Sequence, residues 1–172
     1  MTATACTNTE GGSPIASGDG GQTTTTKSTT RPPRTTSSSA PETAIKPCEL
    51  ISSSAASTLG ITSGPQQKKA GDSPYCEWRV DKDSIADSYT LGIGVLDGVG
   101  LDDIVSSVPV QRVKVGSRNA AQSIGGVHGV ACVISLELTS KSRIDVAAVG
   151  GDPTKLCKPA LDAANVVEPE LP

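Results

Sequence analysis

Alternating hydrophobic and polar residues predict five β-strands in the second part of the chain. The clearest pattern contains Cys76, Trp78 and Val80, whose side chains point to one side of an extended segment while the charged residues between them point to the other. Because every strand alternates, we expect an antiparallel sheet with one covered face and one polar face. The strands are expected at 75–80, 89–96, 110–115, 130–139 and 143–149.

Helical patterns flank the strands at both ends of this region. The segment 47–59 begins with proline, a residue favoured at the first helical position, and carries its large apolar residues on one helical face. The segment 153–168 follows an aspartate, a favoured N-cap, and contains Pro159, which should kink or restart the helix. Loops are expected between the elements at 62–74, 97–107 (with a short helix) and 116–129.

The order helix, five strands, helix predicts an α+β fold. We expect a two-layer sandwich in which the two terminal helices cover one face of a five-stranded antiparallel sheet. One domain, residues 46–172, should hold all of these elements.

Residues 7–45 lack such a pattern and consist mainly of serine, threonine, glycine and proline. Apolar residues are nearly absent there, so nothing offsets the entropy lost on ordering the segment. We expect residues 7–45 to form a disordered tether in front of the domain.

Small residues directly precede Cys6, as at the end of a bacterial lipoprotein signal peptide, where the cysteine is lipidated. The charged and apolar regions of such a signal are missing, and Ala3 stands where these signals usually have leucine. We interpret residues 1–6 as the remnant of the signal, with a true start upstream or a trimmed chain. Lipidated Cys6 would hold the protein on the outer face of the cytoplasmic membrane, unless it is secreted. The alternative is a chance cysteine in a disordered tail.

The other four cysteines predict two disulfides. No CxxC pair occurs and the chain has one histidine, which argues against a closed zinc site. Disulfides indicate an oxidising, extracytoplasmic compartment, whereas five reduced thiols in the cytosol are the alternative. All three pairings are open, although short loops cost less entropy to close. This favours Cys48–Cys76 with Cys132–Cys157 over Cys48–Cys157 with Cys76–Cys132.

Charge and composition exclude several classes of partner. The formal net charge is −3 and the isoelectric point about 5.1, so neither nucleic acid nor anionic lipid is expected to bind through charge. Two tyrosines and one tryptophan are too few for a base-stacking platform. The sequence contains no run of about 18 apolar residues that could span a membrane.

Several short motifs resemble those of an actinobacterial secreted lipoprotein family catalogued as domain of unknown function 3558. They are Pro47-Cys48, Cys76-x-Trp78, Val113-x-Val115-Gly116-x-Arg118-x-Ala120, Cys132-x-Ile134-x-Leu136, Cys157 with Ala160 and Ala164, and Leu171-Pro172. The resemblance covers residues 45–172, with one departure at Ser117, where the family often has glycine. It implies a lipidated N-terminus and a Ser/Thr-rich tether, and it brings no established activity.

The chain offers little for catalysis. His128 lies in a glycine-rich segment, and no Gly-x-Ser-x-Gly nucleophile elbow accompanies it. The glycines at 92 and 94 lie inside an alternating strand, which does not suit a phosphate-binding loop. The carboxylates Asp97, Asp102 and Asp103 miss the spacing of a calcium loop. We therefore expect no catalytic residue, no metal and no cofactor.

The polar sheet face is the remaining candidate for a site. Its strands should project charged residues around a shallow centre formed by the two glycines. We therefore expect a monomeric, non-catalytic binding or scaffolding module of the cell envelope. Its partner would be an envelope protein, a peptide or a wall fragment. The alternatives are an envelope enzyme that uses the loop carboxylates and His128, and a small-molecule sensor or carrier. The candidate binding residues are Arg79, Arg112, Lys114, Glu137 and Arg143.

Overall fold

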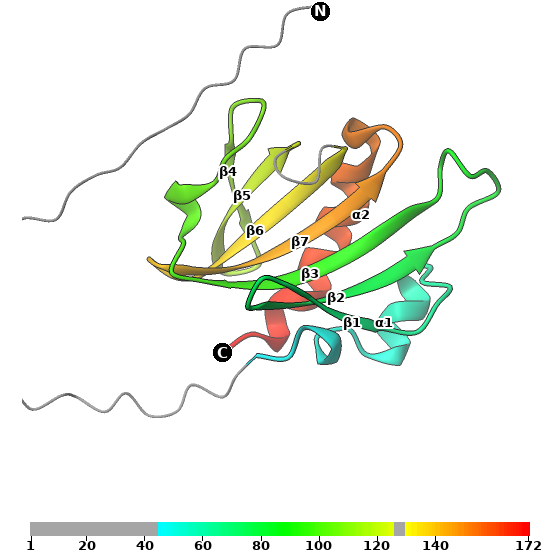
Figure 1. Ribbon diagram of the computed structural model, residues 1–172, viewed down its shortest axis with the longest axis horizontal. Helices are drawn as coiled ribbons and strands as arrows, with labels where there is room; N and C mark the ends of the chain where they lie inside the picture. The colour runs from blue at the N-terminus through cyan, green and yellow to red at the C-terminus, as the bar shows by residue number, and fades with distance from the viewer. Residues whose placement is uncertain (1–44, 126–129) are drawn as a thin grey trace, which may run out of the picture. The chain divides into compact units, whose positions relative to one another are not determined.

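A computed structural model gives the fold of residues 45–125 and 130–172 (Figure 1). The predictions for Cys6 and for the tether up to residue 44 lie outside the described residues, as does His128.

In the described residues, seven strands form a single antiparallel sheet in the order β1-β2-β3-β7-β6-β5-β4 (Figure 1). Two meanders, β1 to β3 and β4 to β7, therefore meet where β3 pairs with β7. The strands are β1 (Gln66–Ala70), β2 (Ser73–Val80), β3 (Tyr89–Asp97), β4 (Gln111–Val115), β5 (Arg118–Ile124), β6 (Ala131–Thr139) and β7 (Ser142–Gly150).

The prediction of five strands is wrong, because β1 and β5 lie in segments expected to be loops. Strand β1 has the sequence Gln-Gln-Lys-Lys-Ala and is exposed throughout. Its single apolar residue, the final alanine, cannot give an alternating pattern. The inner positions of strand β5 hold Arg118, Ala120, Gln122 and Ile124, of which Ile124 alone is large and apolar, so the strand shows no hydrophobic period of two. Strand β1 pairs with β2, and β5 pairs with β4, each across a two-residue turn. Both turns start with a glycine in the left-handed region, Gly71 (φ 61°) and Gly116 (φ 55°).

The first predicted helix is split in two. A 3-10 turn, η1 (Pro47–Glu49), and a short helix, α1 (Ser53–Thr58), enclose Leu50 and Ile51, which are buried. Apolar residues spaced at helical intervals therefore pack against the sheet without forming a continuous helix.

The last helix, α2 (Pro153–Val167), begins as predicted and runs through Pro159 without a break. The Asp152 carboxylate caps it by accepting a hydrogen bond of 3.0 Å from the Thr154 backbone N–H. A 3-10 turn, η4 (Glu168–Glu170), follows it. Helix α2 covers β6 and β7 on one face of the sheet (Figure 1). The buried residues of α2 are Leu156, Ala160, Ala163, Ala164 and Val167.

The hydrophobic core lies between this inner sheet face and the helical segments. It contains the predicted inward residues Cys76, Trp78 and Val80, together with the apolar side chains of β3, β6 and β7. Two disulfides join the layers. Cys48–Cys76 ties η1 to β2, and Cys132–Cys157 ties α2 to β6. This is the pairing that short loop closure favours.

The opposite, outer face of the sheet is not simply a solvated surface, contrary to the expectation of one covered face. The connection from β3 to β4, residues 98–110, crosses it and contains the 3-10 turn η2 (Leu101–Asp103). The Arg143 guanidinium donates a hydrogen bond of 2.6 Å to the Gly100 carbonyl, and the hydroxyls of Ser106 and Ser107 each donate one of 2.9 Å to the Ile124 carbonyl. The connection is thereby fastened over β7, β6 and β5.

Candidate functional site

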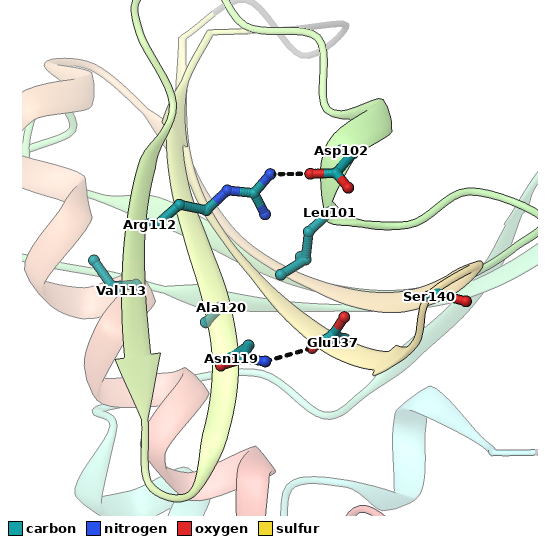
Figure 2. Close-up of a pocket in the computed structure, with 8 residues that line it drawn as sticks. All are labelled: Leu101, Asp102, Arg112, Val113, Asn119, Ala120, Glu137 and Ser140. Carbon is teal, nitrogen blue, oxygen red and sulfur yellow. Dashed lines mark hydrogen bonds and ion pairs between the residues drawn. The ribbon is translucent and has the colours of Figure 1, made fainter.

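A pocket of about 330 Å³ lies on the outer face, between η2 and the strands β4, β5 and β6 (Figure 2). Leu101 extends into it from η2, whereas the side chain of Val113 points away from it. The lining residues are Leu101, Asp102, Arg112, Val113, Asn119, Ala120, Glu137 and Ser140.

Two polar pairs form the walls of the pocket. The Arg112 guanidinium makes an ion pair with the Asp102 carboxylate across the opening, and the Asn119 amide donates a hydrogen bond of 2.8 Å to the Glu137 carboxylate (Figure 2). The Arg112 side chain is 53% exposed and that of Asp102 is 95% exposed. Exposed ion pairs contribute only about 0–1 kcal/mol, so a ligand carboxylate can replace Asp102 at little cost.

The register of the β4–β5 hairpin places these side chains. Arg112 pairs with Ala121 and Lys114 pairs with Asn119, so both basic residues project from the outer face beside an alanine and an asparagine. Glu137 lies on the next strand, close to Asn119.

The five predicted binding residues do not form one site. Arg112 and Glu137 line the pocket, and Lys114 is exposed two residues from Arg112 on β4. Arg143 is buried, and its guanidinium is held by the Asp145 carboxylate at 2.9 Å and by the Gly100 carbonyl, so its role is structural. Arg79 lies on β2 and pairs with Asp81, just beyond the end of that strand. Four strands separate β2 from β4, so the two strands are about 24 Å apart at the usual strand spacing.

Leu101, Asn119 and Ser140 line the pocket but are not among the predicted site residues, and Asp102 was considered only as one of the loop carboxylates. Asn119 belongs to β5, which has no hydrophobic alternation to reveal it. The short helix that holds Leu101 and Asp102 was expected, but its place over the sheet follows from the crossing of the β3–β4 connection. The sequence carries no local signal for that crossing.

The loop carboxylates have separate structural positions. Asp102 pairs with Arg112, Asp103 accepts a hydrogen bond of 2.7 Å from the Gly100 backbone N–H, and Asp97 ends β3. Within residues 45–125 and 130–172, no group of three or more histidine, cysteine, aspartate or glutamate side chains is arranged to hold a metal ion.

A second pocket, of about 430 Å³, lies between α1, α2 and the start of β3. Lys82 and Tyr89 both line this pocket, and the Lys82 ammonium is 5.9 Å from the centre of the Tyr89 ring. Burial, and to a smaller extent the Asp162 carboxylate, raises the pKa of the Tyr89 hydroxyl above its ordinary value. The other residues that line this second pocket are Thr58, Leu59, Pro159, Asp162, Asn165 and Val166.

None of the helices in the described part of the chain is both long and apolar enough to cross a bilayer. Neither the curated proteins nor the solved structures include a significant match to the chain. One family model does match, and it covers residues 1–170. On that match, the chain belongs to the family described as protein of unknown function (DUF3558).

Proposed function

We propose that the protein is a non-catalytic binding module of the cell envelope. In this proposal the lipid on Cys6 anchors it to the outer face of the cytoplasmic membrane, and residues 7–45 hold the domain away from the lipid surface. Two disulfides support an extracytoplasmic location, because such bonds persist in oxidising compartments.

The observation that carries the binding role is the pocket on the outer face. Its frame is rigid, because the strands below it belong to a sheet joined to its helical cover by two disulfides. Its polar groups are weakly engaged, since the ion pair of Arg112 and Asp102 is exposed. A rigid frame with exchangeable polar groups suits the recognition of a partner, since little order is lost on binding.

Site-specific crosslinking in the native envelope tests this function. A photoreactive amino acid replaces Ser140, which is exposed and lies at the rim of the pocket, and in a control it replaces Asp83, exposed on the β2–β3 connection. We expect a discrete crosslinked product from position 140 that Arg112→Ala reduces severalfold. Identical products from both positions, or a product that is insensitive to Arg112→Ala, would contradict the proposal.

The second pocket favours a second candidate function, the carriage of a small amphipathic molecule. Leu59, Pro159 and Val166 offer apolar surface beside Lys82 and Tyr89. Native mass spectrometry of protein isolated from the envelope should then detect a bound small molecule that Val166→Trp displaces. A spectrum of unliganded protein alone would rule this candidate out.

A further inference from the structure

Strand β4 forms one edge of the sheet, and its backbone is available for pairing. Within the part of the chain that the structure describes, β5 is its only neighbouring strand. The strand is exposed at Gln111, Arg112 and Lys114. Edge strands present unpaired N–H and C=O groups on which another chain can build.

The hairpin turn determines which residues carry these unpaired groups. Val115 and Arg118 flank the two-residue turn, so the hydrogen bond that closes the turn joins them. Bonded and non-bonded pairs alternate along an antiparallel ladder. Val115, Val113 and Gln111 of β4 therefore bond to β5. The N–H and C=O groups of Arg112 and Lys114 point away from the sheet.

The opposite side of β5 gives an independent check. The Gly125 N–H donates a hydrogen bond of 2.9 Å to the Ala131 carbonyl, next to the first residue of β6 that pairs with β5. Odd-numbered residues of β5 therefore bond to β6, and even-numbered residues bond to β4. Because Ala120 pairs with Val113, the same two β4 residues are again left free.

The side chains at the two free positions are both basic. Arg112 and Lys114 project from the outer face, and β4 contains no acidic residue. Lys114 takes part in none of the ion pairs of the described residues, and the partner of Arg112 is an almost fully exposed aspartate. The edge therefore combines four free backbone groups with two cations that a partner can neutralise.

We propose that an extended acidic segment of a partner protein adds to β4 as an eighth strand. This inference rests on the proposed binding function and names the class of partner. Backbone hydrogen bonds to Arg112 and Lys114 hold the segment in register. Side chains directly opposite each other lie on the same face, so alternate acidic residues of the segment face the two cations. Asp102 competes for Arg112 and is displaced.

A second copy of this chain does not fit the edge. Antiparallel pairing of β4 with β4 brings the cations of both copies together on one face, where like charges destabilise the pair. The other sheet edge, β1, also carries lysines, Lys68 and Lys69. The chain's own residues 1–44 contain only Glu10, Asp19 and Glu42 as acids, none of them two residues apart. A separate acidic partner is the occupant that the charges favour.

The edge β1 supplies a matched control. Its two-residue turn joins Ala70 and Ser73, so by the same alternation Gln67 and Lys69 carry the outward backbone groups. Lys114→Pro and Lys69→Pro each remove one free N–H and one cation from an edge strand, without removing a hydrogen bond of the sheet. Lys114→Gln removes the cation and keeps the N–H.

The probe is a short blocked peptide in which glutamate alternates with valine, compared with a peptide that has lysine in place of each glutamate. Binding to the full chain is measured by calorimetry, and protection of the Arg112 and Lys114 amides is measured by hydrogen exchange. We expect the glutamate peptide alone to bind and to protect both amides. Lys114→Pro should weaken binding about tenfold and Lys114→Gln about threefold, because a backbone hydrogen bond and an exposed ion pair each contribute modestly. Lys69→Pro should leave it unchanged.

Asp102→Asn sharpens the test, because it frees Arg112 from its internal partner and should strengthen binding about twofold to threefold. Equal binding of the two peptides, or of the wild type and a folded Lys114→Pro variant, would overturn strand addition. If the photoreactive residue at 140 still gave a product sensitive to Arg112→Ala, the binding function would stand while this mode of binding would fall.

Discussion

At the scale of single residues, the turn between β4 and β5 depends on a glycine that no other residue replaces easily. Gly116 has φ 55°, and a Cβ atom there would collide with the Glu168 carboxylate. That carboxylate accepts hydrogen bonds from Ser117, 3.2 Å from its backbone N–H and 2.9 Å from its hydroxyl. The turn is thus fastened to the end of α2.

Gly116→Ala should destabilise the domain by about 1–3 kcal/mol, because it adds backbone strain and displaces the Glu168 carboxylate. Gly92→Ala is the control, since a Cβ at Gly92 meets no atom within 4 Å. It should be neutral or slightly stabilising, because glycine weakens a strand. Urea unfolding measures both. Equal effects of the two substitutions would refute the role given to the turn.

Residue-level reasoning from the sequence identified Arg112 and Glu137 as candidates but treated Arg143 as equivalent to them. All three are charged residues at outward positions of strands, so alternation alone cannot separate them. The difference arises because the β3–β4 connection covers Arg143, and this depends on contacts between residues 43 apart in the sequence.

At the scale of elements, the N-terminus of α2 gives a prediction for pH dependence. Hydrogen bonds from the Thr154 hydroxyl and then from its backbone N–H lower the pKa of the Asp152 carboxyl below its ordinary value. A lowered folded-state pKa stabilises the fold above the unfolded-chain value and loses that contribution as the pH falls through the folded-state value.

The cap should therefore weaken below about pH 4, the unfolded-chain value for aspartate. Asp152→Asn keeps an N-cap acceptor without a titrating group, so its stability should fall less over this range. Urea midpoints of both proteins between neutral and acidic pH measure the difference. The same acid dependence in the two proteins would show that the cap does not titrate as described.

The disulfides give a second prediction at this scale. They close loops with sequence separations of 28 and 25 residues, and each should stabilise the domain by about 3 kcal/mol. Replacing Cys132 and Cys157 together by serine should lower stability by about that amount and loosen α2 first. Hydrogen exchange locates the change. Faster exchange confined to the η1 region instead of α2 would contradict it.

Elements with bulky alternating side chains were predictable. Strands β3 and β7 lie within one residue of the expected bounds, and α2 begins at the expected residue. Strands β1 and β5 were not predictable, because β1 has no apolar residue other than its final alanine and β5 has Ile124 as its only large apolar residue. Both become strands by pairing with a stronger neighbour across a tight turn, which is a tertiary effect.

At the scale of the whole molecule, the order of the strands determines the surface available to a partner. Because β3 pairs with β7, the connection to β4 must pass over the outer face to reach the far edge. This crossing covers part of the face, forms the pocket beside η2 and leaves β4 at the edge. The candidate site is therefore a consequence of topology, and five of its eight residues lie on β4, β5 or β6.

Anchoring is a prediction for the complete chain in its own envelope. Cys6→Ser removes the proposed lipid site and leaves the other four cysteines in place. The variant should move from the membrane fraction to the medium with its disulfides intact, which fractionation and non-reducing electrophoresis measure. Retention of the variant in the membrane fraction would contradict the lipid anchor.

We propose that this disulfide-joined domain works outside the cytoplasm. Peptide mapping by mass spectrometry of unreduced protein, isolated from the native envelope, is the sharpest test. We expect the linked peptides Cys48–Cys76 and Cys132–Cys157 and a lipid mass on Cys6. Four free thiols together with an unmodified Cys6 would contradict it.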